Sequence, residues 1–218
     1  MRGLGWLMTG VAALAWAGSA CGEVSVHGMF GDHAVLQRGI AVPVWGKAAA
    51  GEKVVVTIGG QTATTTAGAD GSWRVNLEPM AAGGPLEMTV AGTNTIVLKD
   101  VVVGEVWIGS GQSNMQMTVG GSRDAGQEMA EATYPMIRQC SVAHRPMAEP
   151  TPEVSTSWTV CSPETVGGFT AVGYFFARDL HKALGVPVGI INSSWGGTPA
   201  EAWTPRDVMK AEGINAGM

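Results

Sequence analysis

The sequence predicts an α/β domain with a parallel sheet, preceded by a small β-sandwich module. Three observations support this fold class. Short apolar runs separated by turn residues fill positions 24–100. A longer apolar run at 101–108 then ends in small and polar residues. Farther along, a helical pattern at 170–184 stands directly before a strand-like run at 186–192, which is the βαβ arrangement of a parallel sheet.

Composition and charge argue against several classes of protein. The chain has 218 residues, of which 32 are glycine and 14% are charged, as in a turn-rich globular protein that contains β-structure. The net charge is −5 and no basic cluster occurs, which argues against nucleic-acid binding. No Cys or His pair has the spacing of zinc ligands. We therefore expect neither a metal nor another cofactor.

Residues 1–20 predict a signal peptide. Arg2 provides the charged start, an apolar stretch follows at 4–16, and small residues stand before Cys21. The apolar stretch is short for a membrane span, so we expect a secreted or periplasmic protein, with a retained N-terminal anchor as the alternative. Cys21 stands where a lipoprotein signal has its lipidated cysteine, but Gly18 occupies a position that is usually aliphatic. A lipid anchor at Cys21 is therefore left open.

The predicted β-sandwich module covers 24–100. Its expected strands are 42–45, 54–58, 62–66, 73–77, 86–90 and 95–98. Asp70-Gly71 stands between two of these strands and predicts a β-hairpin.

The predicted α/β domain covers 101–218. After the strand at 101–108 we expect a short helix within 123–133, a strand at 136–142 and an extended piece at 158–161, then the helix and strand of the βαβ unit. Export permits disulfides, so Cys140 and Cys161 either form one bridge or are two buried small apolar residues.

Ser113 is the candidate nucleophile. It follows the carboxyl end of the 101–108 strand, where open α/β sheets carry their chemistry. The loop at 193–198 follows the second strand in the same way, so both loops are expected on one rim of the sheet. Gly196 and Gly197 in that loop either aim a backbone N–H at an anion beside Ser113 or only turn the chain.

Two blocks of this sequence resemble those of the sialate O-acetylesterases, within the SGNH (GDSL-like) hydrolases. The first block is 105–115 (EVWIGSGQSNM) and the second is 191–203 (INSSWGGTPAEAW). Further similar stretches are 35–38 (VLQR), 42–46 (VPVWG), 70–73 (DGSW), 161–165 (CSPET) and 172–176 (VGYFF). The resemblance covers nearly all of the chain that follows the predicted signal peptide.

The resemblance implies a flavodoxin-like catalytic domain that removes O-acetyl groups from sialic acid or related sugars. Ser113 then attacks the acetyl carbonyl. The backbone N–H of Ser113 and that of Gly196 or Gly197 hold the oxyanion, while Gln112 and Asn114 shape the surroundings. The implied partner is an O-acetylated sugar, and the implied chemistry needs no metal.

The sequence departs from the family in one respect. The family carries its general base as a His with a nearby Asp close to the end of the catalytic domain. The four histidines here, His27, His33, His144 and His181, lack such a context, although His144 is the nearest substitute. We therefore expect a partial domain without a general base, with impaired activity and an open apolar strand edge.

Two other readings stay open. The first is a non-catalytic carbohydrate-binding or scaffold protein, since Trp45, Trp73, Trp158, Trp195 and Trp203 are available to stack on sugars. The second is an esterase that acts on acetylated xylan or another plant polysaccharide.

Overall fold

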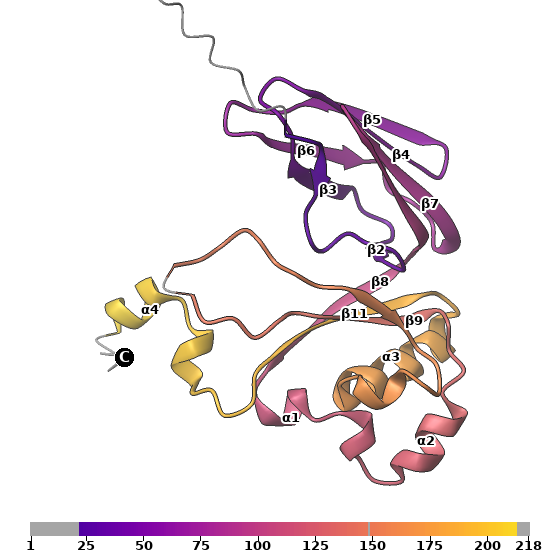
Figure 1. The fold of residues 1–218 in the computed structure, drawn as a ribbon. Coiled ribbons are helices and arrows are strands. Elements are labelled where there is room, and N and C mark those ends of the chain that lie inside the picture. The colour runs from indigo at the N-terminus through magenta and orange to yellow at the C-terminus, as the bar shows by residue number, and fades with distance from the viewer. Residues whose placement is uncertain (1–21, 148, 213–218) are drawn as a thin grey trace, which may run out of the picture.

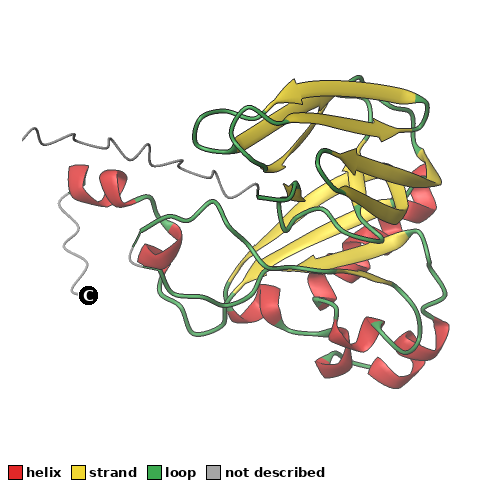
Figure 2. Ribbon diagram, turned by 45° about the horizontal axis from the view of Figure 1, so that its top comes forward, coloured by secondary structure: helices red, strands yellow, loops and turns green. Residues whose placement is uncertain are grey.

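The computed structural model describes residues 22–147 and 149–212, which form two β-sheets and a set of mostly short helices (Figures 1 and 2). The predicted signal peptide at 1–20 and Cys21 lie outside the described residues. No helix in the described ranges combines the length and the apolar character that a membrane crossing requires.

The larger sheet has eight strands in the order β10–β9–β11–β8–β7–β4–β5, with β2 also paired to β8. These are β2 (Val35–Gln37), β4 (Lys53–Ile58), β5 (Gln61–Thr66), β7 (Gly83–Ala91), β8 (Thr95–Gly111), β9 (Ile137–Ser141), β10 (Trp158–Val160) and β11 (Val188–Ser194). β11 runs parallel to β8 and β9, but β7 is antiparallel to β8 and β10 to β9. The prediction of a parallel sheet is therefore confirmed for β8, β11 and β9, and it is wrong for the sheet as a whole, which is mixed. The chain returns antiparallel from β9 to β10 because no crossover helix lies between them.

β8 runs through both parts of the molecule (Figure 1). Its residues up to Val103 pair with β7, and those from Glu105 onward pair with β11. The predicted domain boundary at 100/101 thus falls inside one strand, where Asp100 has a left-handed φ of 55°. His33 Nδ1 lies 2.7 Å from the Asp100 carboxylate, and Arg138 Nη2 donates to that carboxylate at 2.9 Å. Burial alone raises the pKa of Asp100, but these two hydrogen bonds outweigh burial and lower the pKa below its usual value.

The smaller sheet packs its inner face against the larger one. Its three strands are β1 (Ser25–Val26), β3 (Val42–Lys47) and β6 (Ser72–Leu77). Their alternating pattern buries every second side chain, as a strand covered on one face requires. These side chains meet those of β4, β7 and β8 in one core, which includes Val44, Trp73, Val75, Leu77, Val54, Val56, Ile58, Met88, Val90, Leu98 and Val101.

The predicted Asp70-Gly71 hairpin is wrong. The turn itself forms, with the Asp70 carboxylate accepting hydrogen bonds from the Ser72 N–H at 3.0 Å and its hydroxyl at 2.7 Å. However, β5 pairs with β4 whereas β6 pairs with β3, so the link passes from one sheet to the other. Because β6 joins the smaller sheet, its inner side chains are buried against the larger sheet. The two-residue hairpin turn lies instead at Gly59-Gly60, where both φ values are positive.

The helices α1 (Ser113–Gln116), α2 (Ala125–Glu131) and α3 (Ala171–Leu184) lie on one side of the β9–β11–β8 region (Figures 1 and 2). Short 3₁₀ turns occupy Val119–Gly121, Val166–Gly168 and Ala200–Trp203. The predicted helix at 170–184 is confirmed and ends at Gly185, whose φ of 66° suits glycine. The predicted helix within 123–133 and the strands at 136–142, 158–161 and 186–192 are confirmed to within a few residues, whereas α4 (Arg206–Ala211) was not predicted.

Cys140 and Cys161 are buried and unbonded. The structure therefore supports the second of the two predicted alternatives, that of two small apolar residues. Burial raises the pKa of both thiols, that of Cys161 to about 11, so neither is poised to form a thiolate.

Candidate functional site

The parallel strands β8 and β11 end side by side, and the two candidate loops follow them. Ser110 lies opposite Ser193 in the register, and Gly111 lies opposite Ser194. The Trp195 N–H donates to the Gly111 carbonyl at 2.9 Å, which extends the pairing by one residue. The two loops that the sequence predicts on one rim of the sheet are therefore neighbours.

Ser113 begins α1 and has an exposed side chain. Its hydroxyl donates to the Gln112 side-chain oxygen at 2.8 Å. The first N–H groups of a helix have no intrahelical partner, so the backbone N–H of Ser113 belongs to the set that is available to an acceptor. Gln112 and Asn114 flank the serine and are also exposed.

Gly196 of the second loop lies beside Ser113. A Cβ atom built on Gly196 would lie 3.5 Å from both the Cα and the Oγ of Ser113, which is ordinary van der Waals contact. The Gly196 N–H donates to Gln116 Oε1 at 2.6 Å. Gly197 differs, since a Cβ there would meet no atom within 4 Å and its φ is +79°. Gly196 therefore lies beside the serine, whereas Gly197 turns the chain.

Buried contacts fix α1 beneath this loop. Thr170 is fully buried, and its hydroxyl donates to the Met115 carbonyl. Its backbone N–H donates at 2.9 Å to Gln139, whose side chain is also buried, and the Ala171 N–H donates at 2.8 Å to the Met117 carbonyl. The start of α3 and the strand β9 therefore hold the helix that carries Ser113.

Sequence reasoning missed Gln116 and the pair Thr170–Gln139. Gln116 stands three residues after Ser113, which is the spacing of neighbours on one helix face, and that spacing was the available signal. No local pattern indicates the contact between Thr170 and Gln139, because the two residues lie 31 positions apart.

Each of the four histidines has another partner, and none is hydrogen-bonded to Ser113. His144 shares the rim: its Nε2 lies 2.7 Å from the Ser194 carbonyl, and its ring stacks on Trp195 at 4.6 Å and 8°. His33 pairs with Asp100, whereas His27 and His181 contact backbone carbonyls. No histidine therefore holds the serine proton in this arrangement.

A cavity of about 360 Å³ opens on this rim beside α1. It is lined by Gln116, Thr118, Ser141, Val142, Ala143, His144, Gly168, Asn192 and Ser194. Ser113 stands one helical turn before Gln116, at the edge of this cavity rather than among its lining residues. Within residues 22–147 and 149–212, no cluster of three or more His, Cys, Asp or Glu side chains could hold a metal ion.

Comparison with known proteins places these features in context. No family model matches the chain. The sialate O-acetylesterase of Rattus norvegicus is 39% identical over 191 residues, which are 78% of this chain and 35% of that protein. The sialate O-acetylesterase of Homo sapiens is 37% identical over 201 residues, covering 83% of this chain and 38% of that protein. The chain thus spans a little over one third of the length of these curated relatives.

A solved structure gives the same result in three dimensions. The crystal structure of a carbohydrate acetylesterase from Xanthomonas citri matches with a TM-score of 0.83 and 38% sequence identity. The match covers 88% of this chain and 44% of that one. Most of the fold described above is therefore shared with this esterase. Over the matched residues, this chain is similar in sequence to the sialate O-acetylesterases and in fold to a carbohydrate acetylesterase.

Proposed function

We propose that this chain hydrolyses acetyl esters on carbohydrates, with Ser113 as the nucleophile. Its relatives are named sialate O-acetylesterase and carbohydrate acetylesterase, which supports this reaction class. The observation that carries the assignment to Ser113 is the close approach of the Gly196 backbone to the serine across the ends of two parallel strands. A hydroxyl and fixed backbone N–H donors then face the same small volume.

The proposed reaction has two steps. Ser113 Oγ attacks the acetyl carbonyl carbon, and the negative charge that forms on the carbonyl oxygen is held by the N–H groups of Ser113 and Gly196. Collapse of this intermediate breaks the bond to the sugar oxygen, which leaves with a proton as the free hydroxyl. Water then attacks the acetyl-serine, releases acetate and restores the hydroxyl of Ser113.

Gln116 occupies the place that the substrate oxygen takes in this proposal. Its Oε1 accepts the Gly196 N–H at 2.6 Å, which is short for such a bond. An acetyl oxygen that enters the site replaces Gln116 as the acceptor. The amide side chain therefore keeps the donor oriented and satisfied until the substrate arrives.

The serine proton is expected to leave without help from a histidine. Each histidine of the chain is engaged elsewhere, and His144, the nearest along the rim, contacts the Ser194 carbonyl. Loss of the base leaves triad enzymes with only the residual rate that binding and the oxyanion hole supply. We therefore expect slow hydrolysis whose rate rises steadily with pH, without an inflection near the usual histidine pKa of about 6.5.

Measurement of acetate release tests this function and its substrate class. O-acetylated sialic acid and acetylated xylan are offered to the wild-type chain, to Ser113→Ala and to Ser110→Ala, a matched change at another exposed serine on the same rim. We expect release by the wild type and by Ser110→Ala and none above background by Ser113→Ala. Faster release from sialic acid favours a sialate esterase, and faster release from xylan favours the polysaccharide alternative.

Two outcomes would overturn the proposal. Release by Ser113→Ala at the wild-type rate would exclude Ser113 as the nucleophile. Absence of release from both substrates by the wild type would favour the non-catalytic, carbohydrate-binding alternative. Export, which residues 1–20 predict, would bring such a protein into contact with extracellular or periplasmic glycans.

A further inference from the structure

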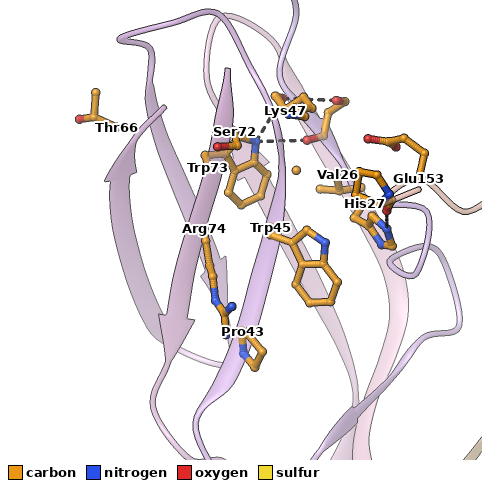
Figure 3. Close-up of a pocket in the computed structure, with 13 residues that line it drawn as sticks. Val26, His27, Pro43, Trp45, Lys47, Thr66, Ser72, Trp73, Arg74 and Glu153 are labelled. Carbon is orange, nitrogen blue, oxygen red and sulfur yellow. Dashed lines mark hydrogen bonds between the residues drawn. The ribbon is translucent and has the colours of Figure 1, made fainter. Parts of the chain in front are cut away.

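A separate concavity lies on the outer face of the three-stranded sheet, away from Ser113. It has a volume of about 540 Å³ and lies between β1, β3 and β6 and the segment that carries Pro152 and Glu153 (Figure 3). The pocket includes none of the residues proposed for ester hydrolysis. This pocket is therefore separate from the proposed site of ester hydrolysis.

Trp45 forms the apolar surface of this pocket. It lies on β3 directly across from Arg74 on β6, and both side chains point away from the core. Figure 3 shows the indole between Arg74 on one side and His27 on the other. His27 packs against the indole at 5.0 Å, and Phe30 meets it edge-on at 4.8 Å. These contacts hold the indole in place before any ligand arrives.

Charged groups without partners surround the indole. Arg74 and Glu153 both line the pocket, and in the described ranges neither side chain makes a hydrogen bond or ion pair. By contrast, Arg38, Arg138 and Arg178 are each paired with a carboxylate. Arg74 offers five N–H donors and Glu153 two acceptor oxygens, so together they match a ligand rich in hydroxyl groups.

The wall opposite the sheet is firmly attached. The Pro152 carbonyl lies 2.5 Å from His27 Nε2, and the Thr156 hydroxyl donates to the Gly28 carbonyl at 2.8 Å. The Trp158 indole N–H donates to the Met29 carbonyl at 2.9 Å. These three bonds tie residues 152–158 to residues 27–29, so the pocket is formed before a ligand binds.

We propose that this pocket is a carbohydrate-binding subsite for a pyranose unit of a glycan chain. The C–H face of the sugar lies on the part of the half-buried Trp45 indole that lines the pocket, while Arg74 and Glu153 bind its hydroxyl groups. A rigid aromatic plate with a few polar groups around it is the usual composition of a site for a small amphipathic ligand. Trp73 does not take part in stacking, because it is buried and donates its N–H to the Ser25 and Lys47 carbonyls.

The same loop connects this pocket to the rim that carries Ser113. His144 contacts the Ser194 carbonyl on that rim, and Pro152 stands eight residues farther along. Eight residues span at most about 29 Å when fully extended. A glycan chain of sufficient length can therefore occupy the pocket while another of its units reaches the rim.

Isothermal titration calorimetry with two defined probes tests the subsite. The probes are sialyllactose, which carries a carboxylate, and xylotetraose, which is neutral. The 218-residue chain carrying Ser113→Ala is used throughout, so that binding is measured without turnover and independently of the proposed ester hydrolysis. Trp45→Ala and Arg74→Ala are compared with Trp107→Ala and Arg123→Ala, which change exposed residues of the same types outside the pocket.

We expect at least one probe to bind, with association at least about tenfold weaker in Trp45→Ala and in Arg74→Ala and unchanged in the two control variants. Binding of sialyllactose alone would favour a sialylated glycan, and binding of xylotetraose alone would favour a xylan chain. Arg74→Ala alters an exposed side chain, so it tests the subsite even if Trp45→Ala fails to fold. Absence of binding of both probes, or binding that survives both pocket variants, would overturn the proposal.

Discussion

The two halves of β8 differ in how the surrounding chain covers them. Val101, Val102 and Val103 are at most 1% exposed, and they lie between β7 on one edge and β2 on the other. Trp107 and Ile108, only a few residues later, are 47% and 69% exposed. A single apolar run thus passes from a closed core to a surface.

The difference arises at the strand edge. The Glu105 N–H donates to the Pro187 carbonyl on the side of β11, and on the opposite edge the Val106 N–H donates to the Gln37 side chain. Beyond Val106, no strand in the described part of the chain pairs with that edge. An interior strand of a parallel sheet is apolar on both faces. The second half of β8 has this composition, but one of its edges has no neighbouring strand among the described residues, and the side chains of Trp107 and Ile108 are exposed.

The largest effect is expected from two tryptophans, one in each region. Trp73 is 3% exposed in the closed core, so Trp73→Ala should lower the free energy of unfolding by about 3–5 kcal/mol. Trp107→Ala, at the open edge, should lower it by about 1 kcal/mol or less. Urea unfolding of both variants measures this difference. Equal losses would mean that the second half of β8 is as well packed as the first.

A smaller effect is expected at Asp100, where the two regions join. The side chain of Arg138 is 3% exposed and loses its carboxylate partner in Asp100→Asn, which should cost about 2 kcal/mol of unfolding free energy. Because the pKa of Asp100 is lowered in the folded protein, the wild type should also lose stability as pH falls below the ordinary aspartate pKa of about 3.9.

Urea unfolding over a pH series checks this prediction. The difference between the wild type and Asp100→Asn should be full near neutral pH and shrink as the carboxylate becomes protonated. A difference that does not change with pH would show that the ionised carboxylate contributes nothing at this junction.

The smallest effect on stability is expected at Ile108. An open, apolar strand edge promotes association between chains, and a charge on such an edge opposes it. Ile108→Lys should therefore change the free energy of unfolding by less than about 1 kcal/mol while reducing self-association measured by light scattering. Ile40→Lys, a matched change at an isoleucine that is 58% exposed elsewhere, should leave association unaltered. Equal association in all three proteins would contradict the importance of this edge.

The sequence predicted local elements better than their pairing. Alternating and helical patterns identified the strands at 42–45 and 73–77 and the helix at 170–184, because each pattern reflects the burial of one face. Pairing depends on contacts distant in sequence. For this reason the Asp70-Gly71 turn was assigned to a hairpin, although it links two sheets.

The domain boundary predicted at 100/101 has a similar explanation. Lys99 and Asp100 interrupt the apolar pattern and look like the end of a strand. In the structure Asp100 takes a left-handed conformation within β8, where His33 and Arg138 bind its carboxylate. Aspartate tolerates this conformation better than most residues, so the strand continues through it.

The candidate site was predictable to the extent that it follows from strand order. Parallel pairing of β8 and β11 brings Ser113 and Gly196 together, as the two similar loops indicated. The bond from Gly196 to Gln116 was not predictable, because it depends on the direction of one side chain at the end of a short helix.

Detection of an acetyl group on Ser113 tests the proposed chemistry most directly. In the proposed reaction no histidine acts as a general base, so water is expected to remove the acetyl group slowly, and an acetyl-serine should accumulate when the chain is mixed with para-nitrophenyl acetate and quenched. Mass spectrometry of the digested protein should then find one acetyl group on the peptide that contains Ser113, and Ser113→Ala should lack it. An unmodified Ser113 peptide, or equal acetylation of Ser113→Ala, would contradict the assignment of Ser113 as the nucleophile.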